Sequence, residues 1–373
     1  MALIGAAALF VGACAKREDA SARNDSAAEQ PMAKMDSGAT AGSSAAAASG
    51  PAAANAGMKG VLDQLASLNG KPIETLTPAE ARKQPSPKDA VVKLLMAQGK
   101  PTDPTQLVPG VTTADRTIPG PGGALPVRIY TPEGNGPFPV IVYYHGGGWV
   151  IANKDVYDPG ARALSKDAGA VVVSVDYRLA PEHKFPAQHD DALATYEWTM
   201  KNAASIKGDP NRIALAGESA GGNLAVATAM LARDKGDKLP VAIASVYPIA
   251  QPDTNTASYV ENATAKPLGR AGMGWFFKQT VRTPADLTDP RIDLVHANLK
   301  GLPPVAIVNA QIDPLRDDGA MLEQSLKRAG VSVDRKVYDG VAHEFFGMGA
   351  VLDEAKDANQ WAADHLKSAF GKK

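Results

Sequence analysis

One pentapeptide constrains the fold of this chain more than any other feature: Gly217-Glu218-Ser219-Ala220-Gly221. It stands between an apolar run at 212–216 and a helix-prone stretch that starts at Gly222. A Gly-x-Ser-x-Gly motif in that context predicts a sharp strand-to-helix turn with the serine at its tip. Such a turn brings strand and helix so close that small residues are needed on both sides, which explains the two glycines. The motif therefore predicts an activated nucleophile, Ser219, at one edge of a sheet.

The pattern around this motif is that of an α/β domain. Short β-branched runs predict strands at 127–130, 140–144, 170–175, 212–216, 241–246, 305–309 and 333–337. Helical periodicity predicts helices at 158–168, 187–204, 219–233, 317–329 and 353–370. Apolar strands that alternate with helices indicate a mostly parallel central sheet with helices on both faces.

The N-terminal residues have a different character. Residues 2–11 form an uncharged apolar run, too short for a membrane span of about 20 residues but suited to the core of a signal peptide. The run ends in Val11-Gly12-Ala13-Cys14, which resembles a bacterial lipobox, so residues 1–14 are predicted to be a signal peptide with Cys14 lipidated. The basic segment that normally opens a signal peptide is missing, and an incidental cysteine in a frayed apolar end stays the alternative.

Residues 15–57 are rich in Ala, Ser and Gly and have no periodic apolar pattern, which predicts a disordered linker. A lipidated cysteine followed by a flexible tether predicts a lipoprotein of the cell envelope, on the periplasmic side of a membrane. A soluble periplasmic or secreted protein is the alternative. Cys14 is the only cysteine, so an internal disulfide is excluded.

The folded domain is predicted to span 58–373. Apolar residues at helical spacing predict a first helix at 58–68, and Thr77-Pro78-Ala79-Glu80 predicts a capping box that opens a second. The segment 249–288 interrupts the strand–helix alternation. Both regions, about 58–100 and 249–288, are predicted to form a helical cap over the sheet. The net charge of −1 gives no reason to expect a nucleic-acid partner.

A serine nucleophile needs a base, and in folds with this turn the chain order is serine, then acid, then histidine. His343 follows the last predicted strand, in the loop 339–343, where such a base is expected. His296 lies in a polar loop before a strand and is a weaker candidate. His365 falls in the C-terminal amphipathic helix and is expected to be an exposed polar residue.

The acid is expected after the preceding strand. Asp313 follows the strand predicted at 305–309, at the carboxyl end of the sheet, where α/β folds place their sites. Asp317 and Asp318 are its rivals, but they fall at the start of a helix, where acids suit the helix dipole without any catalytic purpose.

A glycine-rich loop follows the strand predicted at 140–144: His145-Gly146-Gly147-Gly148-Trp149. Consecutive glycines let backbone N–H groups point into a cleft. Two of them, with the N–H of Ala220, are expected to form an oxyanion hole. His145 itself is expected to stabilise the loop by hydrogen bonding.

Five ordered blocks resemble the bacterial hormone-sensitive-lipase-like esterases. The blocks are His145-Gly146-Gly147-Gly148-Trp149, Asp176-Tyr177-Arg178-Leu179-Ala180-Pro181-Glu182-His183, Gly217-Glu218-Ser219-Ala220-Gly221-Gly222, Asp313-Pro314-Leu315-Arg316-Asp317-Asp318-Gly319 and His343-Glu344-Phe345-Phe346.

The resemblance implies an α/β-hydrolase fold and assigns roles. It implies Ser219 as nucleophile, Asp313 as acid and His343 as base, with oxyanion amides from Gly147, Gly148 and Ala220. It implies no metal or cofactor. Within the second block, Arg178 and Glu182 are expected to pair and fix the loop beneath the site.

These features together predict a serine carboxylic ester hydrolase. The resemblance suggests small-molecule substrates with short- to medium-chain acyl groups, and Trp149, Trp275, Phe276 and Phe277 are candidates for the acyl-pocket wall or, equally, for ordinary packing. An amidase, carbamate hydrolase or deacetylase on the same scaffold is the first alternative. A catalytically inactive ligand-binding protein is the second. The sequence gives no indication of the oligomeric state.

Overall fold

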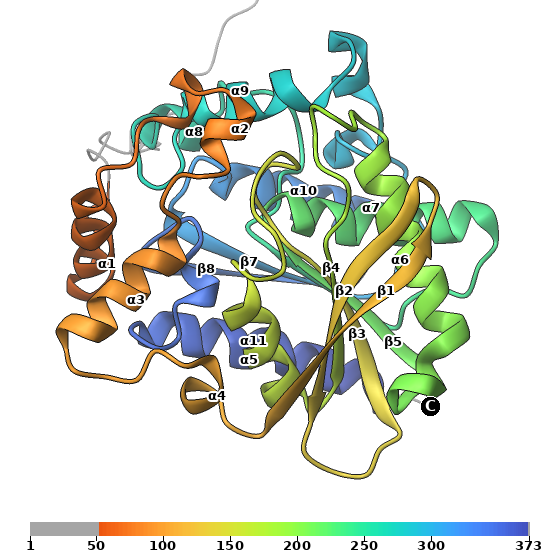
Figure 1. Ribbon diagram of the computed structural model, residues 1–373. Helices are drawn as coiled ribbons and strands as arrows, with labels where there is room; N and C mark the ends of the chain where they lie inside the picture. Colours follow the sequence, from red (N-terminus) through yellow and green to blue (C-terminus); the bar gives the residue numbers. More distant parts are fainter. Residues whose placement is uncertain (1–51, 372–373) are drawn as a thin grey trace, which may run out of the picture. The chain divides into compact units, whose positions relative to one another are not determined.

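The computed structural model describes residues 52–371 of the 373-residue chain. The predicted signal peptide at 1–14, with Cys14, and most of the predicted linker at 15–57 lie outside the described residues. One eight-stranded sheet, in the order β1-β2-β4-β3-β5-β6-β7-β8, organises this part of the chain (Figure 1). Strands β4, β3, β5, β6, β7 and β8 pair in parallel, whereas β2 is antiparallel to both of its neighbours. The predicted mostly parallel sheet is thereby confirmed.

The strands and the main helices have the following bounds. The strands are β1 Val111–Gly120, β2 Gly123–Pro132, β3 Phe138–Tyr144, β4 Val171–Val175, β5 Gly208–Glu218, β6 Ile243–Val246, β7 Val305–Ile312 and β8 Val333–Ala342. The helices are α1 Ala56–Ser67, α2 Pro78–Ala81, α3 Pro87–Ala97, α4 Pro104–Leu107, α5 Asp158–Ala168, α6 Ala187–Asn202, α7 Ala220–Lys235, α8 Ala257–Glu261, α9 Arg270–Thr280, α10 Arg316–Arg328 and α11 Asp353–Phe370.

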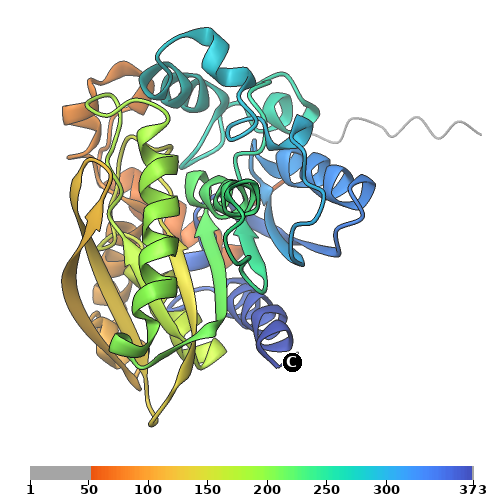
Figure 2. The ribbon, with the colours of Figure 1, turned by 90° about the vertical axis from the view of Figure 1, so that its right-hand side faces the viewer.

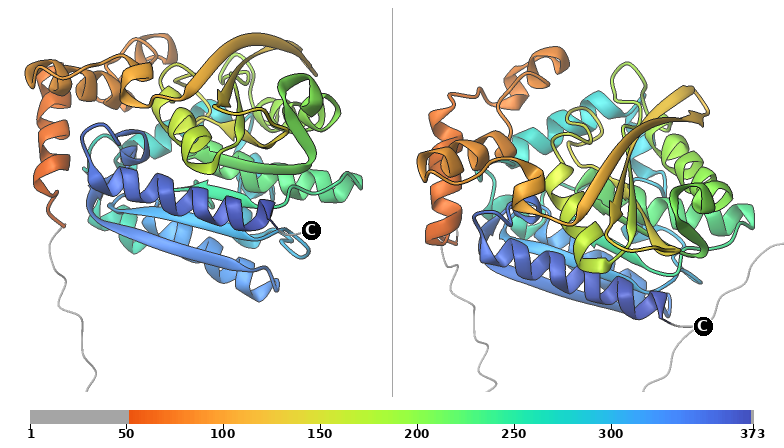
Figure 3. Two further views of the ribbon diagram at one scale, coloured as in Figure 1. Left: turned by 90° about the horizontal axis from the view of Figure 1, so that it is seen from below. Right: turned by 60° about the horizontal axis from the view of Figure 1, so that its bottom comes forward.

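Side chains of the central strands alternate between two apolar layers. In β3, Val140 and Val142 belong to the layer covered by α6 and α7, while Ile141 and Tyr143 belong to the layer covered by α5 and α11. This period of two is expected for a sheet buried on both faces. Figure 2 shows α6 alongside the β1–β2 hairpin, and Figure 3 shows the long α11 lying along the sheet.

The two predicted cap segments contain short helices that meet each other. Helix α1 begins at Ala56, two residues before the predicted start, because the Asn55 side chain accepts a hydrogen bond from the N–H of Met58 and caps it. The predicted capping box of Thr77 and Glu80 is present and opens α2. In the second segment, the indole N–H of Trp275 on α9 donates to the carbonyl of Leu76 at 3.1 Å. Figure 1 shows α2 and α9 close together at one end of the sheet.

The antiparallel edge of the sheet was not predicted from the sequence. Strand β1 is exposed along most of its length, so it lacks the apolar run by which the other strands are recognised. Within residues 52–371, no helix combines the length and the apolar character needed to cross a membrane.

The predicted pairing of Arg178 with Glu182 is wrong. Arg178 binds the carboxylate of Asp191 on α6, with 2.8 Å between Nη2 and Oδ1, and its backbone N–H donates to the same carboxylate. Glu182 instead accepts two hydrogen bonds from Arg82, on the first cap segment. Glu182 is nearer to Arg178 in the sequence, but the fold places the buried Asp191 of the following helix against Arg178.

Replacing Asp191 by alanine is therefore expected to destabilise the domain. The Asp191 side chain is completely buried, and its loss leaves the guanidinium of Arg178, which is 23% exposed, without its carboxylate. We expect the free energy of unfolding to fall by about 2–4 kcal/mol. Asp234→Ala is the control, because Asp234 is 61% exposed beside Arg233 and an exposed pair contributes about 0–1 kcal/mol. Equal denaturation midpoints for the two variants would contradict this account.

Candidate active site

Ser219 lies at the tip of the turn between β5 and α7, as predicted. Its φ of 58° falls in a region that residues other than glycine rarely adopt. Gly221 makes this turn possible: a Cβ at that position would lie 2.0 Å from the carbonyl oxygen of Tyr144, the last residue of β3. The close approach of β3 and α7 thus holds the serine at the carboxyl end of the sheet.

His343 and Asp313 meet Ser219 there. The Nε2 atom of His343 is 3.0 Å from the Ser219 hydroxyl, and its Nδ1 atom is 2.7 Å from Oδ2 of Asp313. The other oxygen of Asp313 accepts a hydrogen bond from the N–H of Leu315 at 2.8 Å, which fixes the carboxylate. All three residues are at most 3% exposed. At these distances the imidazole can take the hydroxyl proton while the carboxylate orients the ring.

The electrostatics favour a basic imidazole. Burial lowers the pKa of His343, but the charge of Asp313 and its hydrogen bond raise it, and nearby Glu344 adds to that effect. The net result is a pKa for His343 above the ordinary histidine value. A higher pKa makes the neutral ring a stronger proton acceptor.

The alternative residues are placed elsewhere. His296 is 73% exposed and pairs with Asp293, and His365 on α11 bonds the carbonyl of Trp361. Asp318 is buried at the start of α10 and accepts a hydrogen bond from the N–H of Ala250, and Asp317 accepts one from Ser258. His343 directly follows β8, because this strand runs to Ala342, five residues beyond its predicted end.

The glycine loop adjoins the turn. Gly147 and Gly148 have φ values of 91° and 57°, so both need the left-handed backbone that glycine tolerates. Across residues 52–371, the N–H groups of Gly147, Gly148 and Ala220 donate to no acceptor. Three backbone donors without partners form a suitable place for a developing negative charge. His145 accounts for the shape of the loop: its ring stacks on Tyr177 with centroids 4.2 Å apart, and its Nδ1 bonds the Gly146 carbonyl.

The aromatic candidates for the pocket wall differ in position. Phe276 lies directly against the glycine loop, since a Cβ on Gly148 would be 2.2 Å from its ring. Trp275 contacts the edge of Phe276, with ring centroids 5.3 Å apart. Trp149 is fully buried and packs near Phe277 in the core beneath the loop.

Comparison with known proteins identifies the family of this chain. Residues 141–347 match the family model described as the α/β-hydrolase fold. The chain belongs to the α/β-hydrolase family. It is 41% identical to carboxylesterase NlhH of Mycobacterium tuberculosis over 72% of this chain and 86% of that protein. It is 33% identical to ethyl acetate hydrolase of Pseudomonas putida over 77% of this chain and 88% of that protein. The crystal structure of a hyperthermophilic esterase from Pyrobaculum calidifontis superimposes with a TM-score of 0.76 at 34% identity, covering 85% of this chain and 98% of that one.

This α/β-hydrolase also has polar residues near the site that the sequence did not predict. Glu218 and Glu344, each adjacent in sequence to a predicted site residue, lie together behind the serine and histidine with three tyrosines: Tyr143, Tyr157 and Tyr247. The tyrosines are far apart in the sequence, so only the fold shows that they meet. The one available signal was an acid directly beside both Ser219 and His343.

Replacing Gly148 by alanine tests the glycine loop. The new methyl group would lie 2.2 Å from the Phe276 ring and must displace either the ring or the loop. We expect kcat/KM for a short nitrophenyl ester to fall by roughly 10²-fold or more, the cost of losing one oxyanion donor. Gly99→Ala is a matched control, because Gly99 has a φ of 66° but nothing within 4 Å of its added Cβ. Similar activity losses in both variants would assign the effect to backbone strain alone.

Proposed function

We propose that this protein hydrolyses carboxylic esters with Ser219 as nucleophile, His343 as general base and Asp313 as the residue that orients His343. Its family membership and its esterase relatives place it among the carboxylic ester hydrolases, enzymes of the serine hydrolase class. The observation that carries the residue assignment is the unbroken line of hydrogen bonds from Ser219 through His343 to Asp313.

In the proposed reaction, the Ser219 hydroxyl attacks the ester carbonyl as His343 accepts its proton. The N–H groups of Gly147, Gly148 and Ala220 stabilise the oxyanion of the tetrahedral intermediate. His343 then returns the proton to the leaving alcohol, and an acyl group remains on Ser219. A water molecule, deprotonated by His343, attacks this acyl-enzyme; His343 then returns the proton to the Ser219 oxygen as the acid is released.

The proposed substrates are esters with short- to medium-chain acyl groups. Phe276 supports this proposal, because its ring rests on Gly148 and closes the space beside the proposed oxyanion donors. Trp275 holds the Phe276 ring from the side and is itself tied to the first cap segment. Trp149, which is fully buried near Phe277, is the third candidate for this wall. One relative, ethyl acetate hydrolase, is named after a short ester.

Ser219→Ala should abolish turnover. Without the nucleophile we expect kcat on a series of C2 to C8 nitrophenyl esters to fall by at least about 10⁴-fold. Ser205→Ala changes an exposed serine after α6 and should leave the rates unchanged. More than a few per cent of residual activity in Ser219→Ala would refute the assignment. Wild-type protein inactive on the whole series would refute ester hydrolysis.

We also propose that the protein is a lipoprotein of the cell envelope, anchored through Cys14. The support is the sequence of residues 1–57, with a lipobox-like Val11-Gly12-Ala13-Cys14 and an Ala/Ser/Gly-rich tether. A soluble periplasmic or secreted form is the alternative.

Cys14→Ser should move the esterase activity from the membrane fraction to the soluble fraction of cells that express the full chain. The catalytic domain is unchanged, so total activity should stay the same, and Ser44→Ala in the tether is the control that keeps its lipid. Unchanged partitioning of Cys14→Ser would reject the lipid anchor.

A further inference from the structure

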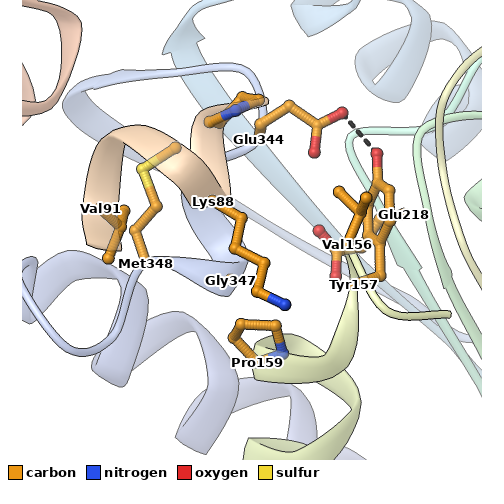
Figure 4. Close-up of a pocket in the computed structure, with 10 residues that line it drawn as sticks. Lys88, Val91, Val156, Tyr157, Pro159, Glu218, Glu344, Gly347 and Met348 are labelled. Atoms are coloured by element: carbon orange, nitrogen blue, oxygen red, sulfur yellow. Dashed lines mark hydrogen bonds between the residues drawn. The ribbon is translucent and has the colours of Figure 1, made fainter. Parts of the chain in front are cut away.

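A buried and a partly buried carboxyl group lie behind the proposed catalytic residues, and the proposed mechanism does not use them. Glu218 is 1% exposed, and the side chain of Glu344 is 18% exposed. Both line one small cavity of about 40 Å³, between the start of α5 and the segment after His343. Figure 4 shows the two side chains converging there, with the Tyr157 hydroxyl hydrogen-bonded to Glu344.

Tyrosine hydroxyls contact both carboxyl groups. Tyr143 and Tyr247 each donate to one oxygen of Glu218, and Tyr157 donates to Oε1 of Glu344 at 2.6 Å. Tyrosine can accept as well as donate, so a proton on Glu218 only reverses the direction of one bond. The arrangement therefore suits either charge state of Glu218.

Glu344 lies within ion-pair distance of a potential cation. Its Oε1 lies 3.7 Å from Nε2 of His343, the nitrogen that faces Ser219. Glu344 reaches this place with a φ of 73°, a backbone conformation that a glutamate adopts only when its surroundings hold it there. Glu218 bonds Tyr143 and Tyr247, and among residues 52–371 no lysine, arginine or histidine nitrogen lies within ion-pair distance of its carboxyl group.

Two carboxylates that line one small cavity do not both ionise readily. Burial, and then the charge of Glu344, raise the pKa of Glu218 to about 8. Burial also raises the pKa of Glu344 above the ordinary glutamate value, although the charge of His343 and the hydrogen bond from Tyr157 limit that rise. The other ionisable groups around the pair are Asp313, Tyr143, Tyr157, Tyr247 and, in the cavity wall, Lys88. The ammonium of Lys88 is bound to the carbonyl of Asp155.

We propose that Glu344 is a charged positioning residue that stabilises the protonated form of His343 from the Nε2 side, while Glu218 is the protonated, neutral member of the carboxyl pair. This inference rests on the proposed role of His343 as base. Asp313 stabilises the imidazolium at Nδ1, and Glu344 adds a second negative charge at the nitrogen that receives the serine proton. Glu218 stays neutral, so the pair contributes one charge and not two.

The pH dependence of kcat/KM tests this proposal. The acidic limb reports the pKa of His343 in the free enzyme, because the base must be neutral. Removing a negative charge beside the imidazolium lowers that pKa, so Glu344→Gln should move the acidic limb to lower pH, by about one unit. On the plateau, kcat should fall roughly three- to tenfold because the base is weaker.

Two variants distinguish charge from packing. Glu344→Asp keeps the charge and should restore the acidic limb to within a few tenths of a unit. Glu218→Gln replaces a neutral acid by a neutral amide and should leave the acidic limb in place. An unmoved limb in Glu344→Gln, or an equal shift in Glu218→Gln, would overturn the proposal.

A measurement without turnover separates this inference from the proposed function. NMR titration of the His343 ring in Ser219→Ala, with and without Glu344→Gln, should show a lower pKa in the double variant. If Ser219→Ala stays active, the proposed function fails. If Ser219→Ala is inactive but the titration does not move, only the role of Glu344 fails. Should Glu344→Gln not fold, Tyr157→Phe takes its place, because it removes the hydrogen bond that favours ionised Glu344. The acidic limb of Tyr157→Phe must then also move to lower pH, and an unmoved limb contradicts the proposal.

Discussion

The close contact of α7 with the end of β3 determines the geometry of the whole site. Gly221 sits against the carbonyl oxygens of Tyr144 and His145, at a distance that no side chain would allow. This contact forces the chain to turn within one residue, and Ser219 takes the left-handed conformation as a result. It also places the loop after β3, with its free N–H groups, next to the serine. The nucleophile and the candidate oxyanion donors are therefore positioned by one packing constraint.

The second predicted cap segment is joined to this frame by buried polar contacts as well as apolar packing. Asp318 accepts from the N–H of Ala250 and from the side chain of Gln251, at the start of the second cap segment. Asp317 accepts from the N–H of Ser258 on α8. Both aspartates open α10, the helix that follows Asp313. The segment that carries Phe276 is thus anchored next to the candidate acid, so the candidate pocket wall and the candidate catalytic residues are held in a fixed arrangement.

Most of the sheet and the three meeting residues could be predicted from the sequence, because each rests on local information. Apolar runs identify buried strands, and the residue after each strand lies at the same sheet edge, which places Ser219, Asp313 and His343 together. The edge strand β1 could not be found, because its exposed side chains leave no apolar run. The partner of Arg178 could not be found either, since the choice between Glu182 and Asp191 depends on how α6 packs. The tyrosines around Glu218 could not be predicted either, because only the fold brings these distant parts of the chain together.

The turn at Ser219 also explains why the residue before the nucleophile, Glu218, is buried. Strand alternation sends the residue before the serine to the layer of α5 and α11, where Tyr143 of the neighbouring strand points as well. A glutamate there is enclosed by hydroxyls, and burial favours its neutral form. The chain after β8 enters the same layer with Glu344. The turn therefore separates the side chains of residues 218 and 219: the Ser219 hydroxyl faces His343, while the Glu218 carboxyl group faces Tyr143 and Tyr247.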